Sequence, residues 1–394
     1  MKTIMNNIDI EFKSPEFNPT SNYQIGQKTN LIGLSKEELI AELEAIGEKS
    51  FRAKQIWNWI YAKGVKDFAQ MSNIAKETQA KLAEKYFISR PQISKDLTSF
   101  DGTRKWLLKF QDGKEVEMVY IPEEDRGTLC ISSQVGCTLT CKFCHTGTQL
   151  LVRNLAASEI VGQLMLARDL LGDWNNSKGD QNRQITSIVF MGMGETLYNY
   201  DNVAASVKIL NDADGINISR RRITVSTSGV VPELMRFSDE VRANLAISLH
   251  ATNDETRSKI MPLNKKYPLA KLMEACEYYL EKNPNQRITF EYVMLKDVND
   301  SDEDARNLAK LINKHKLTAL VNLIPFNKWG GAIYECSSRN RIMAFSNIIK
   351  DSGLSAPIRK TRGEDVMAAC GQLKSESERD KKKKSSLKLS RPYQ

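Results

Sequence analysis

The 394-residue sequence contains no long apolar run. No stretch approaches the ~18 apolar residues of a transmembrane helix. The first residues, MKTIMNNIDIEF, lack the apolar segment of a secretory signal peptide. We therefore expect a cytoplasmic protein without a membrane span. In that reducing compartment, clustered cysteines more often bind metal or do chemistry than form structural disulfides.

The composition is that of an ordinary globular protein, with 41% hydrophobic and 27% charged residues. The length allows two to three domains of about 150 residues each. A net charge of +9 favours a polyanionic partner, most simply nucleic acid, although a solvated basic surface would give the same charge.

The chain divides into four predicted regions. Residues 1–30 have no hydrophobic periodicity and predict a flexible arm, and the charged residues 374–394 predict a disordered basic tail. Residues 31–125 predict a small α+β accessory domain, with a helix at 34–47 and a hairpin at 102–123. Basic residues around Trp57, Trp59 and Tyr61 suit RNA contacts, while core aromatics with solvated lysines are the alternative.

Strand-like and helical segments alternate through residues 126–373. The predicted strands are 128–133, 185–192, 222–229, 244–251, 288–295 and 319–326, and helical periodicity occupies 158–171, 201–213, 269–282 and 302–315. Repeated βα units predict a parallel sheet. Because about six repeats are fewer than the eight of a full TIM barrel, we expect an α/β fold with a partial (β/α)6 barrel.

Three cysteines occur together in CTLTCKFCH, at Cys137, Cys141 and Cys144. Structural zinc needs four ligands, and the sequence lacks a second CxxC pair, while His145 directly follows Cys144 and is a poor fourth ligand. CKFCH also matches the CxxCH signature of haem attachment, which leaves Cys137 unexplained. A disulfide is the remaining alternative.

Three thiolates on a four-iron cluster leave one iron without a protein ligand, which can then bind a substrate or cofactor. The CxxxCxxC motif follows the first predicted barrel strand, where βα loops build active sites. We therefore predict one 4Fe-4S cluster of the radical S-adenosylmethionine (SAM) type on these cysteines.

Several separated motifs extend this prediction. They are LCISSQVGCTLTCKFCHTG, MGMGET, ITVSTSG, ISLHATND, IPFN and RGEDVMAACGQL, together with FRAKQIW and DGTRKW. In this order they resemble the RlmN family, radical SAM enzymes that methylate adenine C2 in ribosomal and transfer RNA. The resemblance covers about residues 30 to 373 and implies a methyltransferase that acts on 23S rRNA and on tRNA.

The resemblance also assigns a SAM-binding role to strand-end residues. These residues are Gly194, Glu195, Ser226, Ser248, Leu249, His250 and Asn327. Without the resemblance they are polar positions at the rim of the barrel, and His250 is typical of a structural histidine. Thr196 stands where the family usually has proline, which leaves the rigidity of that loop open.

Three further residues receive catalytic roles only from the resemblance. Cys370 takes a methyl group from one SAM, and a second SAM yields the 5'-deoxyadenosyl radical that activates this methyl group. Glu117 accepts the C2 proton, and Cys130 attacks the Cys370 sulfur, which gives a transient disulfide that an external electron donor must reduce. Taken alone, both cysteines are typical of buried core thiols.

The sequence is also compatible with two other functions. The related ribosomal resistance methylases use the same chemistry at adenine C8, and no single residue separates them from the C2 enzymes. A non-catalytic RNA-binding protein with a structural metal would explain the charge and the cysteines, but not the strand-end motifs. We expect a monomer. Cys276 and Cys336 are predicted to have no catalytic role.

Overall fold

The computed structural model of the protein describes residues 24–25, 28–174 and 183–375. Most of the predicted arm (1–30) and nearly all of the predicted tail (374–394) lie outside the described residues. Residues 28–30, assigned to the arm, form strand β2 because they pair with a later strand of the N-terminal region.

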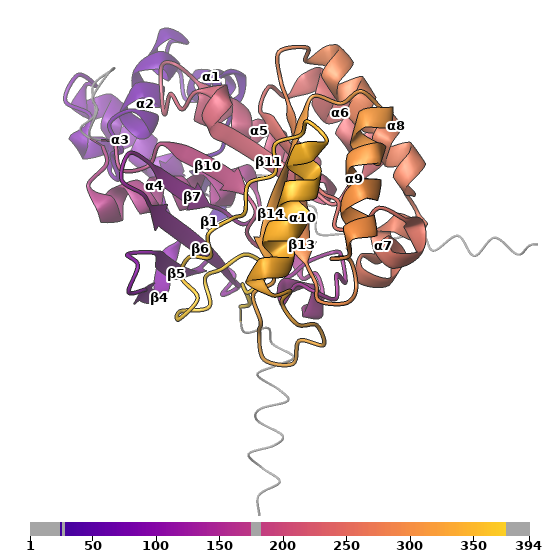
Figure 1. The fold of residues 1–394 in the computed structure, drawn as a ribbon. Coiled ribbons are helices and arrows are strands. Elements are labelled where there is room, and N and C mark those ends of the chain that lie inside the picture. The colour runs from indigo at the N-terminus through magenta and orange to yellow at the C-terminus, as the bar shows by residue number, and fades with distance from the viewer. Residues whose placement is uncertain (1–23, 26–27, 175–182, 376–394) are drawn as a thin grey trace, which may run out of the picture.

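A nine-stranded sheet forms the centre of the molecule (Figure 1). Its order is β14-β13-β12-β11-β10-β7-β6-β5-β4. The strands are β4 (Gln92–Thr98), β5 (Arg104–Lys109), β6 (Glu115–Pro122), β7 (Gly127–Cys130), β10 (Ser187–Phe190), β11 (Ile223–Thr227), β12 (Asn244–Ser248), β13 (Ile288–Met294) and β14 (Ala319–Pro325).

Six of these strands, β7 and β10 to β14, are parallel and lie side by side in chain order. The helices between them are α4 (Ala157–Leu171), α5 (Tyr200–Asn211), α6 (Val231–Glu240), α7 (Asp254–Ile260), α8 (Leu269–Lys282) and α9 (Asp302–Lys314), and α10 (Arg339–Asp351) follows β14. The sheet is not closed, since β14 and β4 are its two ends. The predicted partial (β/α)6 barrel is confirmed.

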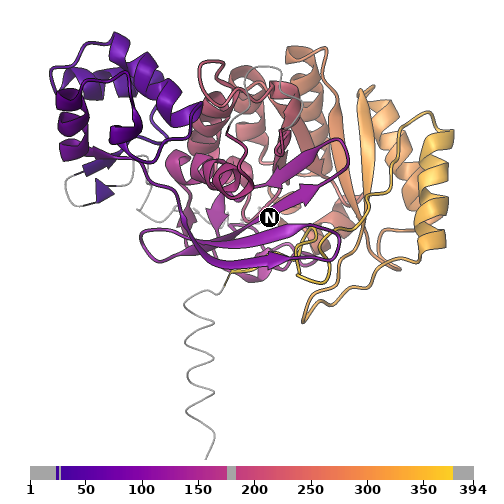
Figure 2. The ribbon, with the colours of Figure 1, turned by 90° about the vertical axis from the view of Figure 1, so that its left-hand side faces the viewer.

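The predicted hairpin belongs to this sheet rather than to a separate domain. Strands β4, β5 and β6 are antiparallel, and β6 pairs with β7, with Val119 opposite Cys130. The boundary predicted near residue 125 therefore corresponds to no break in the structure. Backbone hydrogen bonding across β6 and β7 continues the sheet, and the hairpin extends it at one side of the barrel (Figure 2).

The N-terminal region is a small helical unit beside the barrel (Figure 2). It contains α1 (Lys36–Glu44), α2 (Phe51–Tyr61), α3 (Lys76–Lys85) and the short strands β1 (Gln24–Ile25), β2 (Lys28–Asn30) and β3 (Tyr86–Phe87). Ser35 and Glu38 form a capping box that starts α1, as the sequence indicates.

The aromatic residues of α2 are mainly core residues. Trp57 is 2% exposed and Tyr61 is 1% exposed. The Trp57 indole donates a hydrogen bond to Asp212 at 3.0 Å, which joins this unit to the barrel. These two side chains are therefore packed as core residues, which is the alternative that the sequence left open.

Short elements frame the cysteine motif, and the end of the chain returns to it. Strands β8 (Gln134–Val135) and β9 (Arg153–Asn154) pair on either side of the motif. Short 3-10 helices also occur at Phe68–Gln70, Thr146–Thr148, Thr196–Asn199, Arg220–Arg222 and Pro262–Lys265. Beyond α10, residues 355–359 bond to the free edge of β14 before the chain turns toward the cysteines.

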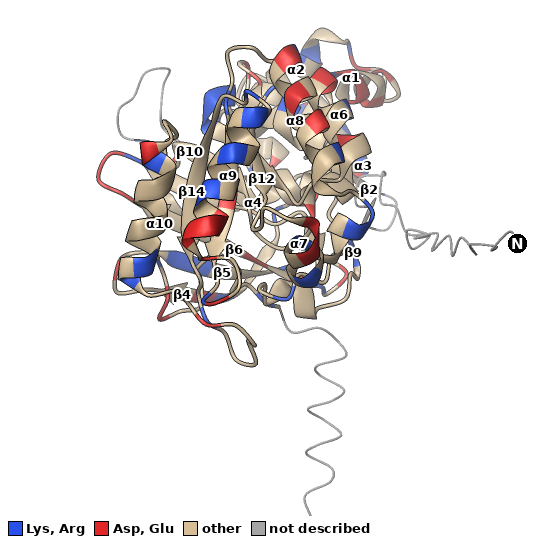
Figure 3. Cartoon of the chain, turned by 45° about the vertical axis from the view of Figure 1, so that its right-hand side comes forward, with Lys and Arg blue, Asp and Glu red and all other residues tan. Residues whose placement is uncertain are grey.

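Both signs of charge occur on the surface helices (Figure 3). Helix α9 begins with three carboxylates and ends with Lys314, which complements its dipole. Among the described residues, no helix has the length and apolar character needed to cross a bilayer.

Candidate active site

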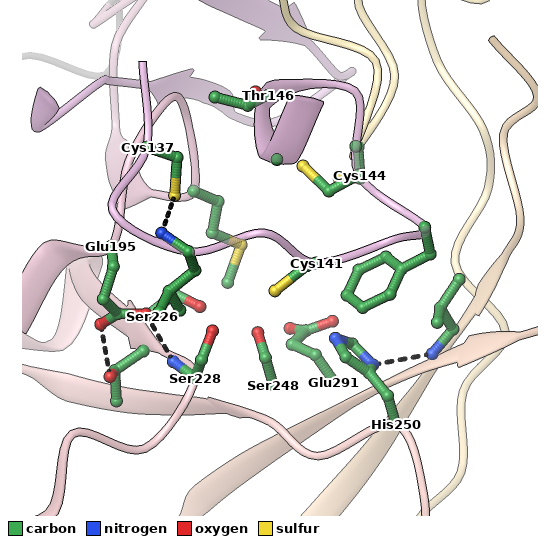
Figure 4. Close-up of a pocket in the computed structure, with 18 of the residues that line it drawn as sticks. Cys137, Cys141, Cys144, Thr146, Glu195, Ser226, Ser228, Ser248, His250 and Glu291 are labelled. Atoms are coloured by element: carbon green, nitrogen blue, oxygen red, sulfur yellow. Dashed lines mark hydrogen bonds between the residues drawn. The ribbon is translucent and has the colours of Figure 1, made fainter. Parts of the chain in front are cut away.

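The three motif cysteines line one pocket at the carboxyl ends of the barrel strands (Figure 4). Cys137 follows β8, and Cys141 and Cys144 lie farther along the same loop. Gly147 closes the loop, because a Cβ there would come within 2.5 Å of the Cys141 carbonyl oxygen. The loop therefore holds all three thiols against the barrel.

Burial raises the pKa of all three thiols, to about 12 for Cys137. Buried thiols of this kind become thiolates when a positively charged metal centre binds them. Soft thiolate ligands suit iron-sulfur clusters as well as zinc. Within the described part of the chain, no three His, Cys, Asp or Glu side chains converge closely enough to share one metal ion. Because each cluster thiolate binds a different iron, a 4Fe-4S cluster does not require that convergence.

The MGMGET loop follows β10 and lies against the cysteine loop. Gly194 has φ +103°, and a Cβ there would be 2.5 Å from the Gln134 Cβ. Only glycine satisfies both conditions. Thr196, where the family usually has proline, is buried and begins a short 3-10 turn, so the chain turns here without that proline.

Glu195 ties two βα loops together. Its carboxylate accepts hydrogen bonds from the Thr227 hydroxyl at 2.6 Å and the Ser228 amide at 2.8 Å. The Leu197 amide donates a third at 3.1 Å. Burial raises its pKa, while these hydrogen bonds oppose that rise. The carboxylate therefore shapes the pocket wall beside the cysteines.

Ser226, Ser248 and His250 line the same pocket (Figure 4). His250 has φ +60°, and its Nδ1 accepts the Val293 amide at 3.1 Å. Burial, with the nearby Arg257 charge, lowers its pKa to about 3, so the ring is neutral near pH 7. Its Nε2 then carries the proton and is a donor. His250 is thus both a bonded structural residue and part of the pocket.

Leu249 differs from its two neighbours. It is fully buried, does not line the pocket, and its amide donates to the Glu291 carbonyl. Strand alternation turns its side chain away from the side to which Ser248 points. The structure therefore gives the Leu249 side chain no place among the groups that line the pocket.

A second cavity adjoins the first and is lined by the two cysteines for which the resemblance predicts catalytic roles. Cys130, at the end of β7, lines this second cavity, and Cys370 lines both. Asn327 also lines it and donates a hydrogen bond to the Cys370 carbonyl at 3.1 Å. Asn327 therefore holds the Cys370 segment, rather than lining the pocket of the three cysteines.

The charge state of Cys130 depends on its surroundings. Burial, together with a negative charge on Cys370, raises its pKa to about 12, and the Arg359 charge opposes this rise. All seven cysteines of the chain are free. A disulfide between Cys130 and Cys370 is therefore absent from this structure.

Glu117 lies on β6 and lines neither cavity. Its carboxylate pairs with the Lys105 ammonium at 2.9 Å and accepts the Lys374 amide at 2.9 Å. Burial raises its pKa, while Lys105 lowers it. Val119, two residues along the strand on the same face, lines the Cys130 cavity. The C-terminal segment thus covers the predicted base.

The comparisons with known proteins agree with this geometry. Residues 29–88 match the ribosomal RNA large subunit methyltransferase N-terminal domain, and residues 131–309 match the radical SAM superfamily. The dual-specificity RNA methyltransferase RlmN of Paramagnetospirillum magneticum is 58% identical over 90% of this chain and 77% of its own length. Its counterpart from Gluconobacter oxydans is 55% identical over 95% and 92%.

The chain belongs to the RlmN family. It is therefore a radical SAM RNA methyltransferase, and this superfamily implies a 4Fe-4S cluster and SAM as cofactors. A crystal structure of a radical SAM methyltransferase from Sphaerobacter thermophilus has a TM-score of 0.82 and 40% identity, covering 88% of this chain and 99% of that one.

Two residues that line the pocket of this RlmN-family chain were not predicted from the sequence. Glu291 on β13 is buried in the pocket, and the Asn322 amide donates to its carboxylate at 2.9 Å. Arg359 lines both cavities. A single acid within the apolar strand ITFEYVM was a readable signal for Glu291. The sequence carried no comparable signal for Arg359, because its position depends on the pairing of residues 355–359 with the edge of β14.

Cys276 and Cys336 lie away from these cavities. Cys276 is fully buried in α8, and Cys336 is exposed in a loop. Neither lines either of the two cavities. Their lack of a catalytic role stays a prediction.

Gly194→Ala tests the close approach of the two loops. We expect a loss of about 1–3 kcal/mol for overpacking against Gln134, added to about 1–2 kcal/mol for the left-handed backbone. Gly113→Ala is the matched control, because Gly113 has φ +77° with open space around it. Urea unfolding of both variants measures the difference, and equal losses would show that the Gln134 contact is unimportant.

Proposed function

We propose that this enzyme methylates C2 of an adenosine in 23S rRNA and in tRNA, with methylated Cys370 as the methyl carrier. The observation that carries the proposal is the position of Cys370. It lines the pocket of the three motif cysteines and also the adjoining cavity that holds Cys130. One sulfur can thus face a cofactor on one side and a second thiol on the other.

The pocket residues suit a cluster and SAM. Cys137, Cys141 and Cys144 would hold the cluster, and Gly194, Glu195, Ser226, Ser248 and His250 form the adjoining wall. When bound, the reduced cluster supplies the electron that cleaves SAM to a 5'-deoxyadenosyl radical. Glu291 and the neutral His250 offer one acceptor and one donor toward this space.

Cys370 performs the first chemical step. Its thiolate attacks the methyl carbon of one SAM, so that a sulfur–carbon bond forms as the sulfonium–carbon bond breaks. A second SAM is then consumed to activate this methyl group, which makes two per turnover. Adenine C2 is electron-poor, so direct polar transfer from SAM to that carbon is not feasible. A carrier thiol is therefore required beside the pocket.

The methylene radical formed from the methyl group on Cys370 bonds to C2, and Glu117 accepts the proton that this carbon then loses. The unpaired electron of the adduct would return to the oxidised cluster, for which the three motif cysteines are the ligands. Its charge is held by Lys105 in a buried pair. Removal of a carbon-bound proton depends on close positioning of the base. Because the Lys374 amide contacts the carboxylate in this structure, the base role requires this one hydrogen bond to open when RNA binds, while Lys105 still holds the Met367 carbonyl.

Cys130 completes the turnover. Its thiolate attacks the Cys370 sulfur, forming a sulfur–sulfur bond, and the electron pair of the broken sulfur–carbon bond stays with the methylene carbon, which is protonated to methyl. An external electron donor then returns both cysteines to free thiols. The Arg359 charge favours the Cys130 thiolate.

The remaining parts of the proposal concern the setting of the reaction. The net charge of +9 supports a polyanionic substrate such as RNA. We propose a monomeric enzyme in the cytoplasm, with residues 31–125 contributing RNA contacts. Within this region, residues 92–122 belong to the barrel sheet, so their RNA contacts would be made from the sheet itself.

The product identifies the reaction. Incubation of RNA with enzyme, SAM and reductant is expected to yield 2-methyladenosine, and omission of either SAM or reductant abolishes it. Mass spectrometry of digested nucleosides measures the product. A yield of 8-methyladenosine would place the enzyme with the resistance methylases and refute the assignment to C2.

The metal content tests the cysteine assignment. Anaerobically purified protein is expected to be brown and to contain about four irons per chain. Replacement of Cys141 by Ala removes one ligand and should abolish the visible absorption, whereas Cys276→Ala should leave it unchanged. Stoichiometric zinc in colourless, reconstituted protein would overturn the cluster assignment.

The two reactive thiols should fail differently when replaced. Cys370→Ala has no methyl carrier and should form no RNA adduct, while its reduced cluster still cleaves SAM. Cys130→Ala should carry methyl on Cys370 and accumulate RNA bound to protein, because the attacking thiolate is missing.

A denaturing gel with labelled RNA shows this difference directly. Cys276→Ala is the control for Cys130→Ala, because it removes another buried thiol that lines neither cavity. If Cys130→Ala carries methylated Cys370 and an intact cluster yet traps no adduct, the assigned roles are wrong.

A further inference from the structure

Lys105 lies diagonally across from Glu117 on the neighbouring strand. On the antiparallel pair β5–β6, Lys105 is opposite Val119, and Leu107 is opposite Glu117. All four side chains therefore share one face. The Lys105 ammonium and the Glu117 carboxylate are 2.9 Å apart, and each side chain is 8% exposed. This is a buried ion pair next to the cavity of Cys130.

The same ammonium also holds the segment that carries Cys370. Lys105 Nζ donates a hydrogen bond to the Met367 carbonyl at 3.0 Å, three residues before Cys370. Met367 has φ +53°, an uncommon conformation for this residue type. On the other side of Cys370, the Lys374 amide donates to Glu117 at 2.9 Å. The ion pair thus anchors residues 367–374 at both ends.

We propose that Lys105 is a positioning residue that keeps Glu117 ionised and fixes the Cys370 segment against the same strand pair. The inference rests on the proposed function, in which Glu117 is the base and Cys370 the methyl carrier. A single ammonium then sets the distance between these two groups. Its second bond, to a backbone carbonyl, is a contact that the charge balance of Glu117 alone does not require.

Two ammonium charges and one backbone amide, from three different elements, lower the pKa of the Glu117 carboxyl. Lys105 on β5 and the Lys374 amide on the C-terminal segment contact it directly, and Lys95 on β4 acts at longer range. Burial raises the pKa of Glu117, and all three groups lower it. Without the Lys105 ammonium, the pKa rises and the carboxyl becomes protonated at a higher pH. The base is then lost near neutral pH and returns as pH increases.

The test compares Lys105→Met, Lys105→Arg and the control Lys109→Met. Lys109 lies on the same strand, four residues along, and is exposed. Single-turnover formation of 2-methyladenosine is measured from about pH 6 to about pH 9 in enzyme with a reconstituted cluster. One unit of pKa shift corresponds to about a tenfold change in the ionised fraction below the pKa.

We expect the acidic limb of the Lys105→Met profile to move to higher pH, with at least about a tenfold loss near pH 7 and partial recovery at high pH. Lys105→Arg keeps the positive charge and should restore the wild-type midpoint. Lys109→Met should match wild type. Circular dichroism and the visible absorption of the reconstituted cluster report whether each variant is folded, and Cys370 methylation, measured by mass spectrometry, reports separately whether the Cys370 segment is still positioned.

Two results would overturn the inference. One is a Lys105→Met profile with the wild-type rate and midpoint. The other is an equal, pH-independent loss in the Met and Arg variants, which indicates a structural role alone. If Lys105→Met does not fold, Lys105→Gln supplies the same uncharged comparison. Wild-type enzyme that methylates Cys370 but makes no 2-methyladenosine would instead refute the proposed function.

Discussion

Parallel pairing of six consecutive strands is the constraint on which the site depends. Because β7 and β10 to β14 run in the same direction, their carboxyl ends meet at one rim. The cysteine loop, the MGMGET loop and the loops after β11 and β12 are therefore neighbours, although about 110 residues separate Cys137 from Ser248. Reversal of any one strand would move its polar end to the opposite side of the barrel.

The second determinant is the return of the chain after α10. Residues 355–359 bond to the edge of β14, and the segment then crosses to the cysteine loop, where the His145 amide bonds the Gly371 carbonyl at 2.7 Å. Asn327 and Lys105 donate hydrogen bonds to two of its backbone carbonyls, those of Cys370 and Met367. Contacts from Lys105, His145 and Asn327, which are far apart in the sequence, thereby place Cys370 between the two cavities.

Burial gives the ionisable groups their properties. It raises the pKa of Glu117, Glu195 and Glu291 and lowers that of His250. Each carboxylate has specific donors that oppose protonation, three for Glu195 and the Lys105 ammonium with one amide for Glu117. Because these groups are buried, the fixed donors act on them at low local dielectric and are stronger than they would be in water.

The local pattern of the sequence was sufficient for the six parallel strands, for helices α4, α5, α8 and α9 and for the cysteine motif, but it did not predict α3, α6, α7 or α10. Alternating βα periodicity predicted the six parallel strands, because burial on both faces makes such strands continuously apolar. The CxxxCxxC spacing predicted the cluster loop, because the three thiols lie within one short segment. Family motifs supplied Glu195, Ser226, Ser248 and His250, which the structure places together in one pocket.

Only the tertiary structure decided which distant groups meet. The hairpin joined the barrel sheet instead of a separate domain, because hydrogen bonding between β6 and β7 leaves no signature in either strand alone. Leu249 and Asn327 do not line the pocket of the three cysteines, whereas Arg359 does. Strand alternation explains the position of Leu249, and the pairing of the C-terminal segment with β14 explains that of Arg359. The contact of Lys105 with both Glu117 and Met367 likewise joins residues up to 262 positions apart. Such contacts depend on register and chain crossing, which a one-dimensional pattern does not specify.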